Sequence, residues 1–221
     1  MTKPANGCAI PDEVPDEMPD KIPGSAPKTG LLILVVGPSG VGKDSLLDGA
    51  RERLATAEQF CFPRRCITRP AGSIGENHIP VRPEDFPSMA KQGAFLLSWQ
   101  AHNLFYGVPR HVQDDVIQGK TVIVNVSRSV INDARSLVGM DHVRVINICA
   151  TAEVLRQRLE ARGREDRYDI AQRLARASAY QVEGPNIIEL HNDADLETGI
   201  RRFIDAVQHQ QDTILSESQP D

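Results

Sequence analysis

Cysteine, lysine and long apolar runs are all scarce in this sequence, and each shortage excludes a class of protein. The chain has only four cysteines, none of them in a CxxC pair, which excludes a disulfide-built scaffold and a cysteine zinc site. No apolar run approaches the roughly 18 residues that a membrane span requires. The opening residues, MTKPANGCAIPDE, lack the apolar core of a secretory leader. We therefore expect a protein of the reducing cytoplasm without a membrane segment.

Net charge is the next restriction, because 25 basic residues stand against 30 acidic ones and leave the chain at −5. An acidic chain is a poor partner for the phosphate backbone, so bulk nucleic-acid binding is not expected. Of the basic residues, 19 are arginine and six are lysine. Guanidinium groups match phosphate oxygens, so this composition suits the binding of small phosphorylated molecules.

A proline repeat separates an N-terminal tail from the body of the chain. Prolines recur at every fourth position from Pro11 to Pro27, between acidic, lysine and apolar residues. Such a segment cannot continue a helix and buries little apolar surface, so residues 1–29 are predicted to be a disordered tail. Docking of the tail to a partner is the alternative. One domain is expected over residues 30–215, followed by a flexible C-terminus over residues 216–221.

Apolar runs alternate with helical patterns through the body. The runs, typical of strands buried on both faces of a parallel sheet, are Leu31–Val36, Thr121–Val126, Val143–Cys149 and the shorter Asn186–Leu190. The expected helices are Ser45–Leu54, Ser129–Val138, Ala152–Ala161 and Asp195–Leu215. Residues 60–110 differ, with turns, short strands and one short helix near Glu84–Gln92. The prediction is an α/β fold, a wound parallel sheet with an inserted small subdomain.

A glycine-rich loop joins the first strand to the first helix. It consists of Gly37, Pro38, Ser39, Gly40, Val41, Gly42 and Lys43. Glycines allow backbone N–H groups to turn toward phosphate oxygens, and the helix N-terminus adds a favourable dipole. Lys43 would reach the β- and γ-phosphates and neutralise charge during transfer. A turn without a ligand is the alternative, but the strand, the spacing and the lysine together predict an ATP site.

The residues after Lys43 depart from the usual magnesium-binding pattern. A serine or threonine is expected directly after the lysine, but Asp44 stands there and Ser45 follows it. The strand Thr121–Val126 in turn carries Asn125 where an acidic residue is expected. We infer that the carboxylate for Mg²⁺ comes from the loop instead of from the strand, so that Asp44 and Ser45 supply the Mg²⁺ ligands. A solvated acid in the first helical turn explains Asp44 almost as well.

Six motifs are spaced along the body: GKDSLL, ITR, GENHI, LSWQAHNLFYGV, VNVSR and LRQRLEARGRE. Together they resemble the guanylate kinase superfamily, and they are similar to the ribose 1,5-bisphosphate phosphokinases of bacterial phosphonate breakdown. The resemblance implies a P-loop NTPase three-layer fold, an acceptor-binding subdomain at about 60–110 and an arginine-rich lid at about 156–176. It also implies ATP-dependent formation of 5-phosphoribosyl 1-diphosphate (PRPP), with ribose 1,5-bisphosphate as acceptor and Mg²⁺ as cofactor.

The acceptor region departs from guanylate kinases where those enzymes read guanine. The resemblance places Arg69 and Tyr106 at the acceptor phosphate, but Gly72 replaces the second arginine of the family's pair. Ser98, beside Trp99, stands where the family has a glutamate, so guanine would lose its carboxylate partner, whereas a sugar phosphate would not. Ser98 and Trp99 are themselves counted among the acceptor-binding residues. The candidates for the ribose hydroxyls or the second phosphate are Asn77, His78, Asn125, Ser127 and Arg128. His78 is equally well explained as a structural residue.

Seven arginines lie between residues 156 and 176, in the region that the resemblance assigns to the lid. Arg162 and Arg164 flank a glycine that interrupts the helical pattern, and we expect both to close on the γ-phosphoryl group as catalytic residues. The other arginines are expected on a solvated helix face (Arg156, Arg167 and Arg176) or are left undecided (Arg158 and Arg173). No general base is needed, because a phosphate nucleophile with a second pKa of about 6 is already ionised near pH 7.

Two other functions stay open. Another acceptor, GMP above all, would make the chain a guanylate kinase or a different small-molecule phosphate kinase. Guanylate-kinase-like domains also occur as peptide-binding modules, but those usually have a degraded phosphate loop, and here the glycines and Lys43 are intact. The sequence does not decide the oligomeric state, and a homodimer is one of the alternatives that stay open.

Overall fold

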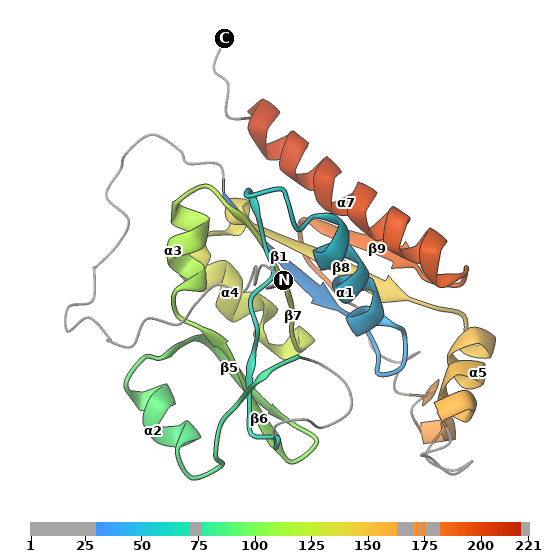
Figure 1. Ribbon diagram of the computed structural model, residues 1–221, viewed down its shortest axis with the longest axis horizontal. Coiled ribbons are helices and arrows are strands. Elements are labelled where there is room, and N and C mark those ends of the chain that lie inside the picture. Colours follow the sequence, from blue (N-terminus) through green and yellow to red (C-terminus); the bar gives the residue numbers. More distant parts are fainter. Residues whose placement is uncertain (1–29, 71–76, 163–169, 173, 176–181, 218–221) are drawn as a thin grey trace, which may run out of the picture.

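The computed structural model describes residues 30–70, 77–162, 170–172, 174–175 and 182–217 (Figure 1). The predicted disordered tail and most of the predicted lid tip lie outside these residues. The described chain contains two sheets and the helices that cover them.

A five-stranded parallel sheet forms the centre of the molecule. Its strands, in spatial order, are β2 (Phe60–Cys61), β7 (Thr121–Asn125), β1 (Leu31–Val36), β8 (Val143–Cys149) and β9 (Ile187–His191). Every neighbouring pair is parallel. The six residues of β1 have no solvent exposure at all, as expected for a strand covered on both faces. The predicted α/β class is confirmed, and β1 and β8 have the predicted bounds.

Alternate residues of β1 enter two apolar cores, one on each face of the sheet. The odd-numbered residues pack with α1 (Lys43–Arg53) and α7 (Leu196–Glu217), which lie together on one side (Figure 1). The even-numbered residues pack with α3 (Val112–Ile117) and α4 (Ile131–Val138) on the other side. Each buried aliphatic side chain contributes about 1.5–3 kcal/mol, so the two cores hold β1 and the loop after it firmly in place.

A smaller sheet has four strands, in the order β4 (Ile79–Pro80), β3 (Cys66–Ile67), β6 (Leu104–Pro109) and β5 (Phe95–Ala101). On one face α2 (Phe86–Lys91) packs through Phe86, which stacks on Phe95 and Phe105. The other face joins the main core through Leu97 and Val108. The predicted insert at about 60–110 corresponds to this unit, except that β2 pairs with the main sheet.

The remaining helices follow the predicted order, with small shifts at their ends. Short 3-10 turns, Arg128–Val130 and Met140–His142, flank α4, and α5 (Ala152–Arg162) follows β8. The sequence pattern does not predict α3, which is only six residues long. α7 continues to Glu217 and so includes the first two residues of the segment that was expected to be a flexible C-terminus. Within the described residues, no helix is long and apolar enough to cross a membrane.

Candidate active site

The loop between β1 and α1 has a backbone that only glycine allows. Gly37, Gly40 and Gly42 have φ angles of +146°, +90° and +99°, in a region that other residues rarely adopt. A Cβ atom on Gly37 would lie 2.4 Å from the Ile148 carbonyl oxygen, and one on Gly40 would lie 2.8 Å from the Leu159 side chain. The loop leads directly into the N-terminus of α1, where backbone N–H groups and the helix dipole favour an anion.

Lys43, the first residue of α1, reaches back across this loop. Its ammonium donates hydrogen bonds to the carbonyl oxygens of Gly37, at 2.8 Å, and Pro38, at 2.9 Å. The side chain is therefore held over the segment that would cradle phosphates, as the phosphate-loop prediction requires. Ser39 and Ser45, the hydroxyl residues of this region, are exposed.

Two distant side chains fix the loop through one carbonyl oxygen, that of Val41. Arg158 Nη1, on α5, donates to it at 3.0 Å, and Asn192 Nδ2, directly after β9, donates to it at 2.8 Å. Asn192 is buried. Leu155 and Leu159 of α5 also lie beside Gly40. The two donors are 117 and 151 residues from Val41, so no local sequence pattern points to either.

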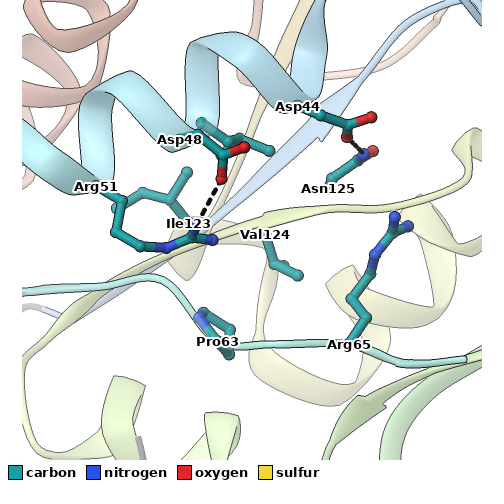
Figure 2. A pocket seen from close by; sticks show the side chains of 9 residues that line it. Asp44, Asp48, Arg51, Pro63, Arg65, Ile123, Val124 and Asn125 are labelled. Atoms are coloured by element: carbon teal, nitrogen blue, oxygen red, sulfur yellow. Dashed lines mark hydrogen bonds and ion pairs between the residues drawn. The ribbon is translucent and has the colours of Figure 1, made fainter. Parts of the chain in front are cut away.

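Asp44 and Asn125 lie side by side in a pocket beside the loop (Figure 2). Asn125 Nδ2 donates a hydrogen bond to Asp44 Oδ1 at 2.8 Å. Carboxylate, hydroxyl and amide oxygens are ligands that Mg²⁺ accepts, and Ser45 adds a hydroxyl next to Asp44. Among the described residues, no group of three or more histidine, cysteine or acidic side chains could hold a metal. Magnesium in a kinase site needs fewer protein ligands, because phosphates and waters supply the rest.

Across the same pocket, Arg65 stacks on two aromatic rings of the small sheet. Trp99 and Tyr106 are paired between β5 and β6, with ring centroids 5.3 Å apart and planes only 4° from parallel. The guanidinium carbon of Arg65 lies 5.6 Å from the Trp99 centroid and 5.3 Å from the Tyr106 centroid. Arg65 lines the pocket together with Asp44 and Asn125. The structure thus joins two predicted acceptor residues to an arginine that sequence reasoning missed.

Four other acceptor candidates lie on the small sheet or next to its strands. Arg69 is half-buried, two residues past β3, and its carbonyl oxygen lies 3.1 Å from His78 Nε2. His78 is buried, so this contact supports the structural explanation for it. Asn77, next to it, is exposed. Ser98 is exposed and, because successive strand side chains alternate, lies on the face of β5 opposite to Trp99. Ser98 is therefore not brought together with the aromatic pair.

Ser127 and Arg128 come shortly after the C-terminal end of β7 in the main sheet. Ser127 caps the 3-10 turn, since its Oγ accepts a hydrogen bond from the Ser129 backbone N–H at 3.3 Å. Burial raises the pKa of the nearby Cys149 thiol, and the positive charge of Arg128 opposes that rise. Arg128 is half-buried. Ser127 has a structural role of its own, and its part in acceptor binding stays a prediction.

The arginines of the predicted lid region fall only partly within the described residues. α5 ends at Arg162, whose side chain is not described, and Arg164 lies outside the described residues. Arg156 is exposed and forms an ion pair with Glu153, as expected for a solvated face. Arg158 instead contacts the phosphate loop. Also outside the described residues are Arg167, Arg173 and Arg176.

One perturbed thiol lies in the small sheet. Burial raises the pKa of Cys66 to about 11, with the nearby charge of Arg64 acting in the opposite direction. The side chain packs with Phe86 and Phe95 on the face covered by α2. A thiol in this environment stays protonated near neutral pH and is a poor nucleophile, so Cys66 belongs to the packing of the subdomain.

A phosphate loop after the central strand of a parallel sheet, a lysine held over that loop and a smaller unit across the pocket together define a P-loop kinase. Kinases of this class transfer a phosphoryl group from a nucleoside triphosphate. The chain belongs to the guanylate kinase family, whose family model matches residues 29–210.

Curated relatives and a solved structure agree with this placement. The bifunctional ribose 1,5-bisphosphokinase-thymidine phosphorylase of Roseobacter denitrificans is 43% identical over 80% of this chain, which spans only 26% of that protein. The ribose 1,5-bisphosphate phosphokinase PhnN of Brucella melitensis is 41% identical over 79% of this chain and 90% of that protein. The guanylate kinase of Anaplasma phagocytophilum matches with a TM-score of 0.58 and 19% identity, over 84% of this chain and 88% of that one. The last match supports the fold alone.

Proposed function

We propose that the chain transfers the γ-phosphoryl group of ATP to the 1-phosphate of ribose 1,5-bisphosphate, which yields PRPP and ADP. An oxygen of the 1-phosphate attacks the γ-phosphorus in line, while the bond from that phosphorus to the β,γ-bridging oxygen breaks. The attacking oxygen needs no general base, because the second pKa of a phosphate ester is about 6. The protein's task is to position two polyanions and to stabilise the charge between them.

The observation that carries the proposal is the likeness to a protein named ribose 1,5-bisphosphate phosphokinase, because it extends over 90% of that protein. The glycine loop and Lys43 support a working kinase over a silent binding module. Ser98 disfavours GMP, because it stands where guanylate kinases carry the carboxylate that reads guanine. The cytoplasm, with its ATP supply, is the proposed location.

The proposed roles divide the site between donor and acceptor. The loop and Lys43 hold the triphosphate, with Arg158 and Asn192 keeping the loop in shape. Arg162 and Arg164 close on the γ-phosphoryl group, where arginine side chains stabilise the charge of the transition state. The reacting 1-phosphate is bound by Arg69 and Tyr106.

Mg²⁺ is the proposed cofactor, and the residues beside the loop suit it. Asp44 supplies the carboxylate, with Ser45 next to it, and the 2.8 Å hydrogen bond from Asn125 orients that carboxylate. Bound together with ATP, Mg²⁺ would neutralise charge on the β- and γ-phosphates. Asp44 would thereby replace the acidic residue that usually ends the neighbouring strand.

The test is to detect PRPP by ³¹P NMR after incubation of the protein with ATP, MgCl₂ and ribose 1,5-bisphosphate. PRPP and ADP should form together, and replacing the sugar by GMP should lower kcat/KM by at least about 100-fold. Turnover of GMP without PRPP formation would make the chain a guanylate kinase. A melting temperature that ATP does not raise would favour the binding-module alternative.

A further inference from the structure

We propose that Arg51, on α1, binds the 5-phosphate of the acceptor and so selects a sugar that is phosphorylated at both ends. This inference rests on the proposed function, in which the 5-phosphate is the group that does not react. Arg51 is half-buried in the last turn of α1 and lines the pocket that this helix shares with β7 and the segment before β3. No step of the proposed reaction assigns a role to it.

The pocket runs along one face of α1, away from the phosphate loop. Asp44, Asp48 and Arg51 line it at successive spacings of four and three residues, which place side chains on the same face of a helix. At 1.5 Å per residue, Asp44 and Arg51 are about 10 Å apart along the helix axis. Figure 2 shows Asn125 beside Asp44 at one end of the pocket and Pro63 on the side of Arg51.

The reacting end of the acceptor belongs at the Asp44 end of this pocket. Lys43, the phosphate loop and the proposed magnesium ligands lie there. The segment that begins at Pro63 runs through β3 toward Arg69, the proposed ligand of the reacting 1-phosphate, so Arg69 also lies away from the Arg51 end. The sugar and its 5-phosphate then extend along α1 toward Arg51.

The length of ribose 1,5-bisphosphate suits this arrangement. Seven covalent bonds join its two phosphorus atoms. The three backbone bonds of an extended residue span about 3.3–3.6 Å, so seven bonds span about 8 Å. With the 1-phosphate at the Asp44 end, the 5-phosphate therefore comes within reach of the Arg51 side chain. A sugar phosphorylated only at C1 cannot make this contact.

Two neighbours hold the guanidinium of Arg51 in place. Its Nη1 donates to Asp48 Oδ1 at 2.6 Å, and its central carbon lies 5.8 Å from the centroid of the buried Phe62 ring. Asp48 takes one N–H of a group that carries five, and two of the five suffice for a bidentate phosphate contact. The Asp48 side chain is 57% exposed, so water screens its charge and weakens its repulsion of a phosphate.

Arg53, in the same turn of α1, provides a comparison. Its side chain pairs with Glu197, at the start of α7, and does not line the pocket. The dipole of a helix favours a cation in the last turn, which accounts for Arg53 and for the charge of Arg51. It does not account for the placement of Arg51 against Phe62 at the end of the pocket, where the second phosphate is expected.

The test compares two acceptors in two variants. Ribose 1-phosphate lacks the 5-phosphate and is otherwise the same sugar. Arg51→Met should lower kcat/KM for ribose 1,5-bisphosphate by about 10- to 100-fold and leave any turnover of ribose 1-phosphate within about two-fold. Arg53→Met, which removes the arginine paired with Glu197, should alter neither value. Equal losses on both acceptors, or no loss on the bisphosphate, would overturn the assignment.

A binding measurement separates this assignment from the proposed reaction. Calorimetric titration without ATP should show that the unsubstituted protein binds the bisphosphate more tightly than ribose 1-phosphate, and that Arg51→Met abolishes the difference. That result upholds Arg51 even where no PRPP forms, whereas PRPP formation with an undiminished preference in Arg51→Met overturns Arg51 alone. An unsubstituted protein without the preference also overturns the assignment.

A second substitution covers the case in which Arg51→Met fails to fold. Arg51→Gln keeps an N–H donor for Asp48 and removes the positive charge, and it is compared with the unsubstituted protein in the same titration. It should lose the preference for the bisphosphate as well. A preference equal to that of the unsubstituted protein would show that Arg51 does not bind the 5-phosphate.

Discussion

Asn125 donates a 2.8 Å hydrogen bond to Asp44, a residue 81 positions earlier in the chain. Parallel pairing of β1 and β7 explains the contact, because Asn125 is in register with Val35, at the end of the strand that leads into the phosphate loop. Asp44 lies in the first turn of α1, where the helix dipole favours a negative charge. Asn125, the last residue of β7, thus donates to the carboxylate of Asp44 instead of supplying a carboxylate itself.

Removing the charge of Asp44 should weaken the use of magnesium. Asp44→Asn keeps the size of the side chain and an oxygen that can accept from Asn125, but it removes the charge that attracts a hard cation. We expect the MgCl₂ concentration for half-maximal activity to rise about 10-fold, with little change in melting temperature. Initial rates, measured at a fixed ATP concentration while the MgCl₂ concentration is varied, give this value. Asp48→Asn is the control, because Asp48 lines the same pocket but is paired with Arg51. An unchanged magnesium dependence in Asp44→Asn would rule out the proposed ligand.

Lys43 should matter for transfer and for the binding of ATP. Lys43→Met removes the ammonium held over the loop by Gly37 and Pro38, and we expect kcat/KM to fall by about 100- to 1,000-fold. The increase in melting temperature that ATP produces should shrink as well. Lys91→Met, at the exposed end of α2, is the matched control and should behave like the unsubstituted protein. Full activity in Lys43→Met would contradict the phosphate-loop assignment.

The donor side of the site could be predicted from the sequence because its signals are local. β1 is a continuous apolar run, and the glycines and lysine of the loop follow it directly. Arg65 could not be predicted in this way, because it meets Trp99 and Tyr106 only after β3 pairs with β6 and β6 with β5. The available signal was a pair of adjacent arginines, Arg64 and Arg65, between Phe62 and Cys66, and the sequence does not tell which of the two is buried.

The position of a residue within a sequence motif also does not determine on which face of a strand its side chain lies. The motif that contains Ser98 and Trp99 predicts that both bind the acceptor, but adjacent residues of β5 point to opposite faces. Only pairing with β6, where Trp99 meets Tyr106, identifies the face of β5 that contacts Arg65. Asn192 was missed for a similar reason, since its partner Val41 is distant in sequence.

The raised pKa of Cys66 gives the protein a measurable loss of stability at alkaline pH. The folded thiol keeps its proton up to a pKa of about 11, whereas an unfolded cysteine loses it near a pKa of about 8.5. Between these values unfolding releases a proton, so the free energy of unfolding falls as pH rises, by up to about 1.4 kcal/mol per pH unit.

Urea unfolding between about pH 8 and pH 10.5 checks this prediction. Cys66→Ala should be less stable than the unsubstituted protein at pH 8, because it leaves a small cavity against Phe86 and Phe95. Its free energy of unfolding should nevertheless decline less steeply as the pH rises. Parallel declines in the two proteins would show that the Cys66 thiol does not contribute to the pH dependence.

Arg156 and Arg158, two residues apart on α5, should differ sharply in their effect on ATP binding. Arg158 donates to the Val41 carbonyl and so ties α5 to the phosphate loop. Arg156 forms an exposed ion pair with Glu153, which water screens and which contributes little to stability. We expect Arg158→Met to raise the KM for ATP about 10-fold, and Arg156→Met to leave it unchanged.

The size of the Arg158 effect is limited because Asn192 still holds the same carbonyl oxygen at 2.8 Å. The loop should therefore stay assembled in Arg158→Met, and the melting temperature without ATP should change little. Arg158→Lys, which keeps a charged N–H donor on a shorter side chain without the guanidinium fork, should recover part of the ATP affinity. If Arg156→Met and Arg158→Met raise the KM for ATP equally, the effect comes from the general positive charge of α5, and the contact with Val41 does not position the loop.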